Sequence, residues 1–138
     1  MNAVEEGLAL QLDFGKLERI GRSGAAVLPV VLQNADSQEV LFVGYANQLA
    51  LTRTLETKTA VLWSTSRDEL WYKGETSGDV LDVIDVRVNC EQNSLLYRVR
   101  PRSGVCHTRG PDGDTRATCY YRGVASDGRS LRLLEPQS

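Results

Sequence analysis

Short apolar, β-branched runs alternate with polar segments in the first half of the chain, a pattern typical of strands joined by turns. Residues 25–33 (AAVLPVVLQ) and 39–46 (EVLFVGYA) are predicted to be two strands. The polar segment 34–38 (NADSQ) between them predicts a hairpin turn, and residues 60–64 (AVLWS) predict another short strand. These runs favour a β-rich fold.

One segment has helical character. Residues 47–57 (NQLALTRTLET) are predicted to form a helix, because Asn47 can cap it and Leu51 and Leu55 lie one turn apart. The following segment 66–79 is polar, aromatic and punctuated by glycines, so we expect most of it to be loop.

The second half contains the clearest strand, residues 80–90 (VLDVIDVRVNC). Residues 94–101 (SLLYRVRP) are its expected hairpin partner, with the turn near residues 91–93. Residues 109–117 (RGPDGDTRA) carry every local sign of a loop. The chain after residue 122 is only weakly patterned.

Length and composition bound the fold and the partners. A chain of 138 residues with 41% hydrophobic residues predicts a single domain over residues 1–138, mainly β (a β-rich α+β fold) with one or two helices. A net charge of -2 gives no general reason to bind nucleic acid or a membrane. No apolar run approaches the roughly 20 residues of a spanning helix, and the acidic N-terminus lacks a signal-peptide pattern. We therefore expect a cytoplasmic protein.

Three cysteines and one histidine are the candidate metal ligands. Three thiols cannot all pair within one chain, and the thiolates of Cys90, Cys106 and Cys119 would suit Zn²⁺. Three thiolates leave a fourth position open for a catalytic water, unless His107 closes the site as a fourth ligand. His107 can instead transfer the proton of that water. The alternative is that the cysteines pack as small hydrophobes, since no spacing forms a C-x-x-C pair.

The end of the strand before Cys90 offers a second possible metal site. Alternation in an extended chain predicts an apolar face that Cys90 continues, made of Ile84, Val86 and Val88. Oxygen-bearing side chains follow on the opposite face, namely Asn89, Glu91 and Asn93. They could converge on a hard cation such as Mg²⁺, although only Glu91 is charged. A polar strand end followed by a turn explains the same residues and is the preferred interpretation.

The segment 63–78 (WSTSRDELWYKGETSG) combines aromatic and basic residues. Its aromatic side chains can stack on a base, while Arg67 and Lys73 can hold phosphate. The small polar turn that follows, residues 74–78, can cradle an anion. An exposed edge with solvated charges and core tryptophans would have the same composition, so the segment alone leaves both interpretations open.

The order of these motifs is specific. Over roughly residues 29–122, the chain resembles the phosphoribosyl-AMP cyclohydrolase family of histidine biosynthesis. Four motifs carry the resemblance, in the order WSTSRDELWYKGETSG, VNCEQNS, GVCHT and TCYYR. The resemblance implies an intertwined, mainly-β homodimer that requires zinc and magnesium. It also implies hydrolytic opening of the adenine ring of 1-(5-phosphoribosyl)-AMP between N1 and C6, which gives a ProFAR-type imidazolecarboxamide nucleotide.

The resemblance carries site residues onto this chain. It implies a zinc site with ligands from both chains of the dimer, made of Cys90, Cys106 and Cys119. Because three thiolates already hold the zinc, His107 is predicted to be the catalytic proton-transfer group. The expected substrate-binding residues are Trp63, Ser64, Arg67, Lys73, Glu75, Thr76 and Ser77.

Two departures from the family pattern affect these expectations. The family carries aspartates in its magnesium motif, where this chain has Asn89, Glu91 and Asn93, which puts the Mg²⁺ site in doubt. Residues 109–117 also lengthen the loop between the last two cysteines, and we expect a surface excursion that leaves the zinc ligands in place. Two other functions stay open, a zinc-dependent purine-nucleotide deaminase and a zinc-stabilised, non-catalytic nucleotide-binding homologue.

Overall fold

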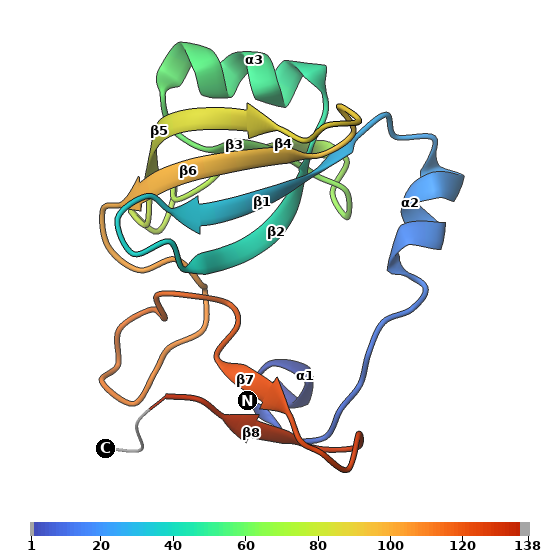
Figure 1. Ribbon diagram of the computed structural model, residues 1–138, viewed down its shortest axis with the longest axis vertical. Helices are drawn as coiled ribbons and strands as arrows, with labels where there is room; N and C mark the ends of the chain where they lie inside the picture. The colour runs from blue at the N-terminus through green and yellow to red at the C-terminus, as the bar shows by residue number, and fades with distance from the viewer. Residues whose placement is uncertain (1, 136–138) are drawn as a thin grey trace.

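A four-stranded mixed sheet with the order β2-β1-β6-β5 forms the centre of the computed structural model, which describes residues 2–135 (Figure 1). β1 (Leu28–Asn34) pairs antiparallel with β2 (Val40–Ala46) and parallel with β6 (Leu95–Pro101). β5 (Leu81–Val88) closes the other edge by antiparallel pairing with β6. The predicted strands and both of their hairpins are confirmed.

The helix predicted from residue 47 onward is α3 (Gln48–Thr57), and Asn47 caps it by accepting a hydrogen bond from the Ala50 amide at 2.9 Å. Its buried side chains are Ala50 and Thr54, whereas Leu55 is 57% exposed, so the pairing of Leu51 with Leu55 did not identify the buried face. The Thr54 hydroxyl explains the difference. It accepts a hydrogen bond from the Val61 amide and so ties the helix to the next strand.

A second β-layer packs on the sheet. The hairpin of β3 (Val61–Ser64) and β4 (Glu69–Tyr72) contributes Leu62 and Trp71 to the core that also buries Tyr97. Residues 66–79 are mostly loop, as expected, but they also contain the strand β4. That strand has only four residues, and its pairing with β3 defines it more than its own polar composition does.

A bulge changes the predicted face of β5. The register shifts between Val83 and Asp85, which leaves Ile84 46% exposed. Val83 and Val86 therefore share the core-facing side, opposite Val99 and Tyr97. Of the predicted face of Ile84, Val86 and Val88, only Val86 packs against the core. One extra residue in a strand reverses the alternation, which turns Ile84 outward, and Val88 is 55% exposed at the end of the strand. Cys90 lies beyond the strand and is exposed.

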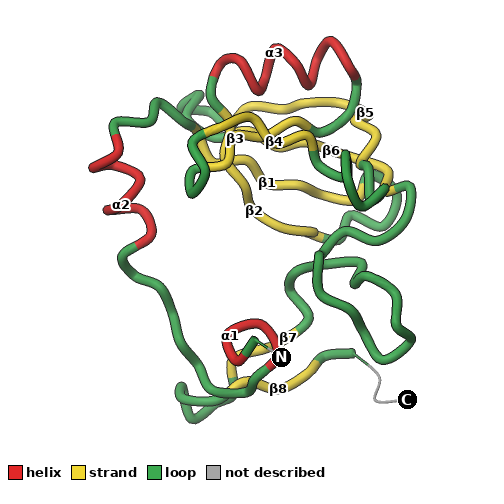
Figure 2. The backbone as a smooth tube through the Cα atoms, turned by 180° about the vertical axis from the view of Figure 1, so that it is seen from behind, coloured by secondary structure: helices red, strands yellow, loops and turns green. Residues whose placement is uncertain are grey.

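The N-terminal segment with α1 and the β7–β8 hairpin lie together, away from the sheet (Figures 1 and 2). The β7–β8 hairpin, at Arg122–Val124 and Leu131–Leu133, contacts residues 8–10 through backbone hydrogen bonds to Leu8 and Leu10. α2 (Lys16–Ser23) lies on the segment between α1 (Ala3–Glu6) and β1.

No pattern in the sequence was interpreted as α1, α2, β7 or β8, and three of these four elements have only three or four residues. Three helices lie within residues 2–135, where one or two were expected, and the β-rich α+β class is confirmed. No helix in this part of the chain is long and apolar enough to cross a membrane.

Candidate active site

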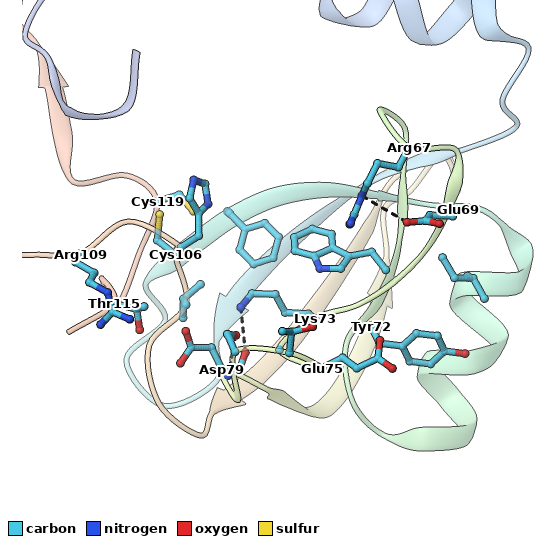
Figure 3. Close-up of a pocket in the computed structure, with 18 residues that line it drawn as sticks. Arg67, Glu69, Tyr72, Lys73, Glu75, Asp79, Cys106, Arg109, Thr115 and Cys119 are labelled. Carbon is cyan, nitrogen blue, oxygen red and sulfur yellow. Dashed lines mark hydrogen bonds and ion pairs between the residues drawn. The ribbon is translucent and has the colours of Figure 1, made fainter. Parts of the chain in front are cut away.

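A pocket of about 420 Å³ opens between the β3–β4 hairpin and the loop that follows β6 (Figure 3). Predicted residues from three motifs meet there, although these motifs are separated in sequence. The residues concerned are Arg67, Lys73, Glu75, Thr76, Ser77, Cys106, His107 and Cys119.

Two predicted substrate-binding residues are not in the lining. Trp63 is half-buried in β3 opposite Leu70, and the Ser64 hydroxyl accepts a hydrogen bond from the Arg67 amide at 3.2 Å. Ser64 therefore shapes the turn that carries Arg67. The aromatic wall of the pocket is instead made by Phe42 and Trp71, whose ring centroids lie 6.1 Å apart. Trp71 belongs to the aromatic segment that the sequence singled out, whereas Phe42 had no such signal.

Lys73 is a buried cation at this site, with 8% of the residue exposed. Its ammonium donates to the main-chain oxygen of Asp79 at 3.0 Å. Burial lowers the pKa of Lys73, and the negative charges of Asp79, Cys119 and Cys106 partly oppose that effect. Lys73 thus supplies positive charge close to both sulfurs.

The turn after Lys73 is fixed by a glycine and an acid. Gly74 has φ +83°, and an added Cβ would lie 2.4 Å from the Asp79 and Val80 backbones, so a side chain does not fit. The Asp79 carboxylate accepts a hydrogen bond from the Ser103 hydroxyl, which holds the pKa of Asp79 below its usual value. Sequence reasoning missed Asp79, because only the fold brings Ser103 and Thr115 to it.

Cys106 and Cys119 both line the pocket, and Figure 3 shows the two side chains next to each other. Cys106 is buried, and its sulfur lies 3.0 Å from the Thr108 hydroxyl. The hydrogen bond from Cys119 is the main reason that the pKa of Cys106 falls to about 5, and the same contact raises the pKa of Cys119. One sulfur of the pair is therefore readily a thiolate, the form that binds metal.

Cys90 is not part of this pair within one chain. It follows Val88, which lies opposite Leu95 at the start of β6, whereas the pocket loop leaves the other end of that strand at Pro101. Six steps along a strand span about 20 Å. Among residues 2–135, no group of three His, Cys, Asp or Glu side chains lies close enough to hold a metal ion.

The three residues of the possible magnesium motif lie in the exposed β5–β6 turn and bind one another. The Asn89 amide donates to Asn93 at 2.7 Å, and the Asn93 amide donates to Glu91 at 3.1 Å. The Asn89 oxygen also accepts the backbone amides of Asn93 and Ser94. With a single carboxylate and oxygens already engaged, this turn does not fit the donor set that Mg²⁺ prefers.

His107 lies at the rim of the pocket, next to Cys106, with 76% of its side chain exposed. Its Nε2 lies 2.8 Å from a carboxylate oxygen of Glu5, which belongs to α1. This hydrogen bond raises the pKa of His107. No pattern in the sequence predicted this contact between Glu5 and His107.

Comparison with known proteins gives a consistent result. A protein-family model described as phosphoribosyl-AMP cyclohydrolase matches residues 42–121. A protein of that name from Roseobacter denitrificans is 38% identical over 120 residues, covering 87% of this chain and 88% of the relative. The namesake from Methanothermobacter thermautotrophicus is 42% identical over 82% of this chain and 76% of its own length. Another, from Halobacterium salinarum, is 42% identical over 95% of this chain and 96% of its own length.

Proposed function

The chain belongs to the phosphoribosyl-AMP cyclohydrolase family, and we propose that it catalyses the reaction in that name, in histidine biosynthesis. Water adds to C6 of the adenine ring of 1-(5-phosphoribosyl)-AMP, and the N1–C6 bond breaks to give a ProFAR-type imidazolecarboxamide nucleotide. The observation that carries this proposal is the pocket itself, where the Cys106–Cys119 pair lies beside Lys73, His107 and an aromatic wall.

The thiol pair fits a zinc ion. Cys106 and Cys119 would provide two ligands, and Cys90 from a second copy of the chain would provide the third. Zinc bound there would lower the pKa of a water at the open fourth position to near neutrality. The donor set of soft sulfurs, one of them with a strongly lowered pKa, supports this choice of metal.

The other residues of the pocket bind the substrate and move protons. The wall formed by Phe42 and Trp71 offers an apolar surface on which a purine can stack. Arg67 and Lys73 supply positive charge for phosphate, together with the amides and hydroxyls of the turn at residues 74–78. His107 would take the proton of the attacking water and return it to the departing N1.

A shared site requires a dimer, and we propose the intertwined homodimer. The position of Cys90, about 20 Å along the sheet from the pocket end, supports it. Apolar side chains near that turn are also exposed in the single chain, among them Ile84 and Val88. We assign no magnesium-dependent step to Asn89, Glu91 and Asn93. The cytoplasmic location stays a prediction from the sequence.

The deciding experiment is turnover of 1-(5-phosphoribosyl)-AMP by the purified protein with added Zn²⁺ and Mg²⁺, followed by mass spectrometry. Ring opening adds the mass of one water and keeps every nitrogen. A zinc-dependent deaminase would release ammonia instead. Binding without turnover would support a non-catalytic, zinc-stabilised homologue, an alternative that the loss of acidic residues around Cys90 favours.

A further inference from the structure

The loop at residues 109–117 was expected to be a surface excursion, but its base is built into the pocket. The amides of Val105 and Cys106 both donate to the Arg116 main-chain oxygen, and the Arg116 amide donates back to Thr108. Arg109 and Thr115 face each other across an isolated bridge. Both residues line the same pocket as the thiol pair.

Arg109 is an exposed cation held in place by its own loop. One guanidinium nitrogen donates to the Gly113 main-chain oxygen at 2.7 Å. No carboxylate within residues 2–135 forms an ion pair with Arg109, whereas Arg67 has Glu69 at 3.6 Å. Because a guanidinium has five N–H donors in a fixed fork, Arg109 keeps donors for an anionic ligand.

The two arginines lie at opposite sides of the pocket. Figure 3 shows Arg109 beside Cys106 and Cys119, and Arg67 on the opposite side of the pocket. The pocket therefore has a cationic side chain at each end, and the same lining includes the thiol pair and the rings of Phe42 and Trp71.

The proposed substrate has a matching shape, and this step rests on the proposed function. It is a purine with one phosphoribosyl group on N1 and another on N9, so it carries a phosphate on each side of the ring system. C6, the carbon that water attacks, is bonded to N1. With C6 at the sulfurs, the N1 substituent leaves the ring on the Arg109 side and the N9 substituent leaves on the Arg67 side.

We propose that Arg109 binds the phosphate of the N1-linked ribose and thereby makes the enzyme select a doubly phosphorylated nucleotide over a mononucleotide. The residue sits on the loop between Cys106 and Cys119, which reaches the pocket through Arg109 and Thr115. Arg67 serves the N9-linked phosphate, which a mononucleotide such as AMP also carries.

Steady-state kinetics of the zinc-loaded enzyme test the assignment, with AMP as a competitive inhibitor. A hydrogen-bonded ion pair with phosphate is worth roughly one to two powers of ten in affinity. Arg109→Gln should raise KM for 1-(5-phosphoribosyl)-AMP by about 10- to 100-fold and leave the inhibition constant of AMP unchanged. Arg67→Gln should weaken the binding of both ligands. Arg109→Lys, which keeps the charge, should recover part of the loss.

Two controls distinguish a loss of phosphate binding at Arg109 from a general loss of charge or of loop structure. Arg129→Gln removes the same charge from the exposed β7–β8 turn and should change neither constant. Glutamine at position 109 can still donate to the Gly113 oxygen, so an equal thermal midpoint would show that the loop is intact. Unchanged KM in Arg109→Gln, or an equal loss for AMP, would overturn the assignment alone. A wild-type protein without turnover would overturn the proposed function and this assignment with it.

Discussion

Asp79 and Lys73 are buried polar residues whose chemistry depends on their neighbours. Asp79 takes hydrogen bonds from Ser103 and Thr115 and lies beside the Lys73 ammonium, while Lys73 is held by the Asp79 main-chain oxygen. Hydroxyl groups thus satisfy the Asp79 carboxylate, and a main-chain oxygen satisfies the Lys73 ammonium, in a place where an unpaired charge would be costly. Both residues line the pocket that holds the thiol pair.

The lowered pKa of Asp79 predicts how stability changes with pH. A carboxyl group with a folded-state pKa below its unfolded value of about 3.8 stabilises the fold above that pH, and this contribution disappears as pH falls through the folded-state pKa. Asp79→Asn should therefore lower the free energy of unfolding at pH 7, and the gap to wild type should close below about pH 4. Urea unfolding of the wild type and the variant across this pH range measures the difference in their free energies of unfolding. A gap that stays constant with pH would contradict the prediction.

His107 allows a prediction about catalysis. If it transfers protons without binding metal, His107→Ala should lose about 10²–10⁴-fold in kcat and keep its zinc content. Kinetics and elemental analysis of the same preparation measure both quantities. Loss of zinc in step with activity would make His107 a ligand, and a small loss of rate would leave it only a packing role.

The sequence predicted which residue types would form the site better than it predicted their surroundings. Cys106, His107, Arg67 and Lys73 could be named because few side chains offer metal binding, proton transfer or phosphate binding. Trp63 does not line the pocket of the single chain, whereas Trp71 of the paired strand does. Contacts such as that of Glu5 with His107 join residues a hundred positions apart, and no local pattern encodes them.

Among the elements, the long strands and the capped helix followed from periodicity, and the errors arose where pairing outweighs it. β4 exists because β3 offers it a partner, and the β5 bulge reverses the faces of a strand that alternates cleanly in sequence. The α3 helix shows the same effect on a smaller scale. Thr54 faces the core while Leu55 is exposed, because the Thr54 hydroxyl contacts the next strand.

Thr54 allows a prediction about how α3 is held to the next strand. Thr54 is fully buried, donates to the Ala50 carbonyl and accepts from the Val61 amide. Thr54→Val keeps the volume but leaves that amide without its partner, so it should cost about 1–3 kcal/mol of unfolding free energy. Thr52→Val, on the exposed face of the same helix, is the matched control and should cost less than about 0.5 kcal/mol. Equal costs would show that helix propensity alone explains both.

For the whole molecule, the decisive feature is the separation of Cys90 from the Cys106–Cys119 pair. A single chain holds two thiols at the pocket and the third at the opposite end of its sheet. The sequence singled out the three cysteines as candidate ligands, and the resemblance implied a site shared between chains, but the cysteine positions alone do not tell which thiols the fold brings together. If the proposed dimer forms, two inactive cysteine variants should restore part of each other's activity, and that recovery can be measured.

Complementation between two inactive variants tests whether Cys90 of one chain completes the site of the other. Cys90→Ser and Cys119→Ser should each lose zinc and activity, because every site in either homodimer lacks one thiolate. In a mixed dimer, Cys106 and Cys119 of the first variant meet Cys90 of the second, so one of the two sites is complete. Coexpression in equal amounts, with half of the dimers mixed, should restore about a quarter of the wild-type zinc and activity.

Mixing Cys106→Ser with Cys119→Ser is the control and should restore nothing, because those two ligands come from the same chain. No recovery in the first mixture, or an active monomer by light scattering, would refute the shared site.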